Sequence, residues 1–101
     1  MAPGLPGPLP VVTLYGRPGC TLCLEAEQEL RRLARKLRFT LDVVDIEQDD
    51  TLLERFMFEI PVITLGREEL ARAPIRRGAL ELRLREALGL RREGGIGANQ
   101  G

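Results

Sequence analysis

The two cysteines of the chain, Cys20 and Cys23, are separated by two residues. They follow an apolar, β-branched run, Val11 to Tyr15, and a turn-forming segment, Gly16 to Gly19. An amphipathic segment comes next, so the pair is predicted where a strand leads into a helix. In disulfide exchange the nucleophile is a thiolate, which the partial positive charge at a helix N-terminus stabilises. The pattern therefore predicts a redox-active dithiol.

Within this dithiol we expect Cys20 to attack a substrate disulfide and Cys23 to resolve the mixed disulfide that results. With only two residues between them, the cysteines can form a disulfide and separate again with little backbone motion. Arg17, three residues before Cys20, would add positive potential and lower the pKa of the Cys20 thiol further. Because the chain has no histidine, a cysteine–histidine catalytic pair is excluded.

The same spacing leaves other interpretations open. Two cysteines make half of a zinc site, and two copies of the chain would have to share it because zinc takes four ligands. An iron–sulfur cluster bridged by a dimer follows the same logic. The pair could also pack as inert core residues, or serve a regulatory redox sensor that differs from an oxidoreductase only in its partner.

Length and composition predict a single globular domain. The chain has 101 residues, 15 basic and 15 acidic, and 44% of its residues are hydrophobic. Its formal net charge of zero leaves no global field to attract nucleic acid or a membrane surface, so we expect neither as a partner. Separately, we expect a monomer.

The ends of the chain differ in composition from its centre. Residues 1–10 are rich in Pro and Gly, residues 91–101 are Gly-rich and polar, and both are expected to be disordered, leaving a domain of residues 11–90. Without a signal-peptide or membrane-spanning run, the expected location is the cytoplasm. In that reducing compartment, paired cysteines are more often catalytic, redox-sensing or metal-binding than structural.

Two strands and a helix are predicted to position the cysteines. The helix runs from about Cys20 to Leu37, and a second β-rich run covers residues 39–46. A strand that follows such a helix is normally parallel to the strand before it. One face of the predicted helix carries Leu22, Ala26, Leu30, Leu33 and Leu37.

The second half of the chain predicts four further elements. Thr51 to Glu54 matches a capping box, which predicts a short helix to about residue 58 with Phe56, Met57 and Phe58 in the core. A strand over residues 61–65 and an antiparallel return strand over residues 69–73 follow, with a turn between them. Apolar residues at positions 80, 84, 87 and 88 predict a last helix from Ile75 to Leu90. The predicted order is β-α-β-α-β-β-α.

Three segments together resemble the glutaredoxin family of the thioredoxin fold, and its small glutaredoxin-like branch in particular. They are Thr13 to Cys23, Val44-Asp45-Ile46 and Glu59 to Val62. The likeness covers roughly residues 11–90. A CxxC pair is weak evidence alone, but a CxxC pair after the first strand, with a Pro-led third strand farther along, is specific. The resemblance implies an α/β thioredoxin-like fold, with a four-stranded mixed sheet and three helices.

The resemblance also implies site residues and partners. Pro61 would be the family's cis-proline facing the dithiol, although cis bonds form only about 5% of X–Pro bonds and the local sequence alone predicts trans. The Ile60 backbone would hydrogen-bond the substrate cysteine, while Arg17 and Tyr15 match a basic and an aromatic position. The substrate would be a protein or small-molecule disulfide, with glutathione or a thioredoxin-reductase-type donor as the candidate electron source and no metal or other cofactor.

Two departures from the family stand out. Thr21-Leu22 occupies the position where typical dithiol glutaredoxins carry Pro-Tyr. The Gly-Gly and Asp that bind the γ-glutamyl end of glutathione are not apparent, because Leu70 to Pro74 fills that region. Leu14 stands where a thioredoxin would carry a buried Asp, so the chain does not match an ordinary thioredoxin either.

Overall fold

A computed structural model describes residues 8–90, so the predicted tail at residues 91–101 and most of the predicted tail at residues 1–10 lie outside the described residues. The elements follow in the order β1 (Val11–Gly16), α1 (Thr21–Leu37), β2 (Thr40–Asp45), η1 (Ile46–Gln48), α2 (Asp50–Phe56), β3 (Val62–Leu65), β4 (Glu68–Arg72) and α3 (Arg77–Leu88). This is the predicted β-α-β-α-β-β-α order, with the short 3₁₀ helix η1 added after β2.

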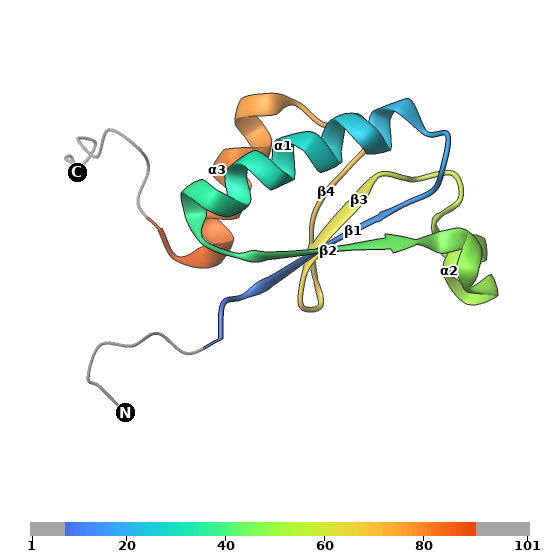
Figure 1. The fold of residues 1–101 in the computed structure, drawn as a ribbon, viewed down its shortest axis with the longest axis horizontal. Helices are drawn as coiled ribbons and strands as arrows, with labels where there is room; N and C mark the ends of the chain where they lie inside the picture. The colour runs from blue at the N-terminus through green and yellow to red at the C-terminus, as the bar shows by residue number, and fades with distance from the viewer. Residues whose placement is uncertain (1–7, 91–101) are drawn as a thin grey trace.

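The four strands form one mixed sheet, as predicted, and their order in it is β2-β1-β3-β4. β1 pairs with β2 in parallel, from Val11 opposite Thr40 to Gly16 opposite Asp45. β3 pairs antiparallel with both β1 and β4. The carboxyl ends of β1 and β2 therefore meet at one edge of the sheet, where the chain turns into α1 (Figure 1).

Helices α1 and α3 lie together over one face of the sheet, whereas α2 lies at the end of the sheet (Figure 1). Side chains from α1, α3 and the four strands build the main core under the helix pair. A smaller cluster of Ile46, Phe56 and Val62 forms beneath α2, with Tyr15 packed against it. The long helix that carries the cysteines is thus anchored by the main core.

The buried stripe of α1 differs from the predicted one at its first position. Cys23, not Leu22, begins the buried series that continues through Ala26, Leu30, Leu33 and Leu37. Leu22 is 54% exposed. Leu22 and Cys23 lie at opposite edges of the stripe, each about 50° from its centre, so helical periodicity does not choose between them. In the structure Cys23 is the one that packs against Gly16 of β1.

The start of α2 also differs from the prediction. The cap is Asp49, whose carboxylate accepts hydrogen bonds from the N–H groups of Thr51 and Leu52 at 2.8 and 3.1 Å. The predicted capping box at Thr51 is therefore wrong, since an aspartate two residues earlier already satisfies the first donors. The helix ends at Phe56, which is buried, while Met57 and Phe58 lie beyond it and are 36% and 90% exposed. Of the three residues predicted in the core, only Phe56 is confirmed there.

Helix α3 begins at Arg77, two residues later than predicted. Ile75 packs against the main core from the extended segment that precedes the helix, so its apolar character belongs to the core and not to the helix. Ala73–Pro74 is a cis peptide bond that the sequence did not predict. No helix within residues 8–90 is long and apolar enough to cross a membrane.

Candidate active site

Cys20 and Cys23 form a disulfide in this structure, with their Cα atoms 5.2 Å apart. Cys20 is the N-cap of α1, in extended backbone conformation, and Cys23 lies in the first turn. The Cys23 N–H donates a hydrogen bond to the Cys20 Sγ at 3.1 Å. The sulfur of Cys20 thus occupies the position that a serine or aspartate oxygen usually takes at a helix start.

The two cysteines differ in exposure and in neighbours. Cys20 is partly exposed, whereas Cys23 is 6% exposed. Gly16, the last residue of β1, is packed against Cys23 so closely that a Cβ at Gly16 would lie 3.0 Å from the Cys23 Cβ. The outer sulfur is therefore open to a partner, and the inner one is held against the sheet.

The turn before the helix is closed by a hydrogen bond from the Cys20 N–H to the Arg17 carbonyl at 3.3 Å. Gly19 has a φ of +83°, a conformation that suits glycine. The Arg17 guanidinium is 3.7 Å from the Glu47 carboxylate of η1. Sequence reasoning singled out Arg17 but not Glu47, because η1 itself was not predicted.

The Ile60–Pro61 peptide bond is cis, as the resemblance implies. Pro61 is buried, and its carbonyl accepts a hydrogen bond from the Ala73 N–H at 3.1 Å. The Ile60 N–H donates to the Phe56 carbonyl at 3.2 Å. The resemblance implies that the Ile60 backbone contacts the substrate, and a substrate that accepted from the Ile60 N–H would have to replace this bond.

An ion pair from Arg72 on β4 holds the segment before Pro61. Its guanidinium contacts the carboxylates of Glu59 at 2.7 Å and Glu69 at 2.6 Å. The hydrogen bond with Arg72 is the main cause that lowers the pKa of Glu69, and the same bond raises the pKa of Arg72. The approach to Ile60 and Pro61 is thereby tied to the edge strand of the sheet.

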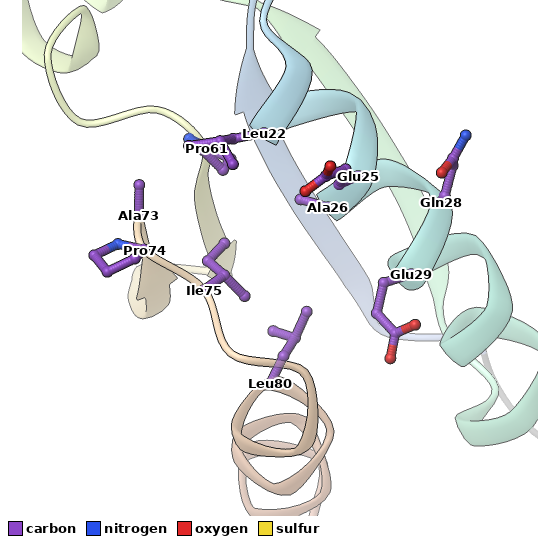
Figure 2. Close-up of a pocket in the computed structure, with 10 residues that line it drawn as sticks. All are labelled: Leu22, Glu25, Ala26, Gln28, Glu29, Pro61, Ala73, Pro74, Ile75 and Leu80. Carbon is purple, nitrogen blue, oxygen red and sulfur yellow. The ribbon is translucent and has the colours of Figure 1, made fainter.

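Two cavities flank the dithiol. The first, which we call the cysteine cavity, has a volume of about 440 Å³ and is lined by both cysteines, by Arg17 and by apolar residues that include Leu24 and Val43. The second, the proline groove, has a volume of about 520 Å³ and lies between α1, Pro61 and the start of α3. Its walls are Leu22, Glu25, Ala26, Gln28, Glu29, Pro61, Ala73, Pro74, Ile75 and Leu80 (Figure 2).

The predicted site residues divide between these features. Cys20, Cys23 and Arg17 share the cysteine cavity, and Pro61 lines the proline groove. Tyr15 lines neither cavity, because its ring packs on Phe56 with the ring centroids 4.9 Å apart. Substrate binding by Arg17, Pro61, Tyr15 and Ile60 stays a prediction.

Sequence reasoning missed Gly16, Glu25 and Glu47 as parts of the site. The relevant signal for Gly16 was its place directly before the CxxC turn, where a close backbone approach favours glycine. For the metal alternative, the part of the chain between residues 8 and 90 contains no group of three or more Cys, Asp or Glu that could hold a metal ion. A site that takes two cysteines from each of two copies of the chain stays a prediction.

The fold and the dithiol together define the class of protein to which this chain belongs. A comparison with models of known protein families gives the same class. The model of the glutaredoxin-like domain (DUF836) matches residues 11–85, so the chain belongs to this glutaredoxin-like family.

Solved structures of similar proteins extend the comparison. A structural-genomics target protein from X. campestris is 27% identical, with a TM-score of 0.63 over 74% of this chain and 96% of that one. Protein Ne2328 from Nitrosomonas europaea is 26% identical, with a TM-score of 0.62 over 81% and 96%. Thioredoxin 1 from Thermosipho africanus, at 14% identity, has a TM-score of 0.61 over 78% and 94%. This last likeness shows the thioredoxin-like fold alone.

Proposed function

We propose that the protein is a thiol–disulfide oxidoreductase in which Cys20 is the nucleophile and Cys23 the resolving cysteine. The observation that carries the proposal is the hydrogen bond from the Cys23 N–H to the Cys20 Sγ at the start of α1. In the reduced protein the same N–H, together with the helix N-terminus, would stabilise a thiolate on Cys20. Its partial exposure leaves that thiolate open to attack a disulfide.

The reaction takes place in two exchanges. The Cys20 thiolate attacks one sulfur of the substrate disulfide, a mixed disulfide forms, and the other substrate sulfur leaves as a thiolate that takes up a proton. The Cys23 thiol then loses its proton and attacks the Cys20 sulfur, which releases the second substrate thiolate. The substrate gains two electrons and two protons, and the protein is left with the Cys20–Cys23 disulfide.

Regeneration requires the reverse exchange with an external dithiol or with two thiols. We propose glutathione or a thioredoxin-reductase-type partner as the source of these electrons. A reduced resting state fits a reducing compartment, so we place the activity in the cytoplasm. No metal or further cofactor takes part in these steps.

The test is a single-turnover reaction of reduced protein with 2-hydroxyethyl disulfide, followed by intact-mass spectrometry. The wild type is expected to end as the intramolecular disulfide. Cys23→Ser should stop at a mixed disulfide with 2-mercaptoethanol on Cys20, because the resolving sulfur is absent. Cys20→Ser should show little reaction, since the buried Cys23 is poorly accessible. Reaction of Cys20→Ser at the wild-type rate would refute the assignment.

A further inference from the structure

We propose that the proline groove selects disulfide partners that carry positive charge beside the reactive cysteine, and that Glu25 determines this specificity. The inference rests on the proposed function of the dithiol and names its substrate class. That class is a disulfide in a polypeptide whose cysteine is flanked by Arg or Lys, in preference to an anionic disulfide such as oxidised glutathione.

The groove adjoins the reactive sulfur. Leu22 stands between the two cysteines in the sequence, is 54% exposed, and lines the groove together with Pro61. One turn of an α-helix rises only about 5.4 Å, so a peptide joined to Cys20 reaches the groove within one or two residues. Leu22, Ile75 and Leu80 give the groove apolar walls that suit such a peptide.

The charged groups of the groove are carboxylates. Glu25 and Glu29 line it, and among the lining side chains that the structure describes none is basic. The Glu29 carboxylate is bound by Arg32 at 2.6 Å. Glu25 is exposed, and no residue from 8 to 90 forms an ion pair with it. Figure 2 shows the Glu25 carboxylate extending from α1 on the side of the groove, whereas Gln28 points away from it.

The nearby cations whose side chains the structure describes do not offset this carboxylate. Arg17 belongs to the cysteine cavity on the other side of the dithiol, and its guanidinium already faces Glu47 at 3.7 Å. Arg76 follows Ile75 in the sequence but is not part of the groove wall. Because the chain has no net charge, local groups such as Glu25 decide which charge the groove attracts.

Charge complementarity therefore favours a cationic peptide as the ligand of the groove. Glutathione carries two carboxylates and one ammonium group, so each half of its disulfide is anionic and would be repelled by Glu25. An Arg or Lys near the substrate cysteine would instead gain an ion pair on binding. At an exposed site such a pair changes binding only several-fold, and salt reduces the effect.

Two peptides make the test. They differ only in carrying Arg or Glu on both sides of a single cysteine, and each is activated as a 2-pyridyl disulfide. The Cys20 thiolate attacks the peptide sulfur, the peptide–pyridine S–S bond breaks, and the released thiolate takes up a proton to give 2-thiopyridone. Cys23 then displaces the peptide thiol. Thiopyridone absorbance gives the rate constant of the first exchange, and 2-mercaptoethanol gives the intrinsic reactivity of each peptide.

After correction for intrinsic reactivity, the Arg peptide is expected to react about threefold to tenfold faster at low ionic strength, and salt should narrow the difference. Glu25→Gln should reduce the ratio of the two rates to about half or less. The control is Glu54→Gln, because Glu54 is an exposed residue of α2 that lines neither cavity. Circular dichroism and thermal unfolding establish that both variants are folded.

The outcomes separate the inference from the function on which it rests. If the corrected ratio is near one, or if Glu25→Gln leaves it unchanged, the specificity is refuted while the dithiol chemistry stands. If Glu54→Gln reduces the ratio as much as Glu25→Gln does, the selection does not belong to the groove and the inference fails. If neither peptide oxidises the protein, both the proposed function and the inference that rests on it are refuted.

Discussion

Gly16 is packed directly against the resolving cysteine. A Cβ on this glycine would lie 3.0 Å from the Cys23 Cβ and 3.1 Å from the Cys23 Sγ. Both neighbours are firmly placed, since Gly16 ends the central strand β1 and Cys23 begins the buried stripe of α1. The contact therefore fixes how far the first turn of α1 stands from the sheet.

We expect Gly16→Ala to destabilise the protein and to slow formation of the Cys20–Cys23 disulfide. The added methyl group must displace Cys23, and such overpacking costs about 1 to 3 kcal/mol. Urea unfolding of reduced protein measures the first effect, and the rate of oxidation after a mixed disulfide forms on Cys20 measures the second. Gly78→Ala is the control, because a Cβ there meets nothing within 4 Å. Equal effects of the two substitutions would show that the contact with Cys23 is unimportant.

The Cys20 thiol is expected to ionise more readily than a free thiol. In the reduced protein its sulfur would keep the N-cap position, where the Cys23 N–H donates to it. The rate of alkylation of Cys20 against pH, with the modified residue read by mass spectrometry, should give an apparent pKa below the free value of about 8.5. A value at or above that figure would mean that the helix start does not activate Cys20.

Glu81 links α3 to α1 and should make stability depend on pH. Its carboxylate lies 3.1 Å from the Lys36 ammonium and 3.1 Å from the Arg85 guanidinium. The hydrogen bond from Lys36 is the largest cause that lowers the pKa of Glu81. A carboxyl group with a lowered pKa in the folded protein stabilises it above the pKa of the unfolded chain, and this contribution is lost as pH falls through the folded value.

Glu81→Gln should accordingly lower the free energy of unfolding at neutral pH by about 0.5 to 1 kcal/mol, a small value because the group is partly solvated. The difference from wild type should shrink as the pH falls below the unfolded pKa of about 4.3, and it should be lost once the pH has passed the lower pKa of the folded protein. Urea unfolding across this pH range is the measurement, and Glu54→Gln should show no comparable change. A difference that persists undiminished in acid would exclude the ion pair as its cause.

Arg72 is expected to restrain the segment that leads into Pro61. Removing its guanidinium leaves Glu59 without the contact at 2.7 Å. In Arg72→Met, the amides of Glu59 and Ile60 should exchange hydrogen about threefold to tenfold faster, while those of β1 should not change. Arg83→Met, which removes exposed ion pairs to Glu68 and Glu86, is the control. Unchanged exchange at Glu59 would show that the hydrogen bonds from Glu59 and Ile60 to Phe56 suffice to hold the segment.

Much of the fold could be predicted because its signals are local. The β-branched run before Gly16, the long amphipathic helix and the Pro-led third strand gave the element order and the mixed sheet, and the position of the cysteine pair at a helix start followed from them. The cis bond before Pro61, by contrast, could not be predicted from local sequence. Local odds favour a trans bond, and only the resemblance to a family indicated cis.

The rest depended on choices between neighbouring residues or on distant contacts. Asp49 and Thr51 are both good helix caps, and the sequence does not show which one the backbone uses. Leu22 and Cys23 are both apolar and lie at opposite edges of the buried stripe, so the sequence does not show which of them enters the core. The proline groove joins Glu25 to Ile75, residues that no local pattern relates.

The hydrogen bond at the start of α1 also couples the chemistry of the site to the order of the helix. The Cys20 sulfur is the reactive atom and, at the same time, the acceptor that caps the first turn. A thiolate is a stronger acceptor than a sulfur bonded to a second sulfur. Each transfer of electrons therefore changes the strength of the hydrogen bond that caps the first turn of α1. The chemical shift and the hydrogen-exchange rate of the Cys23 amide should follow the redox state of the protein.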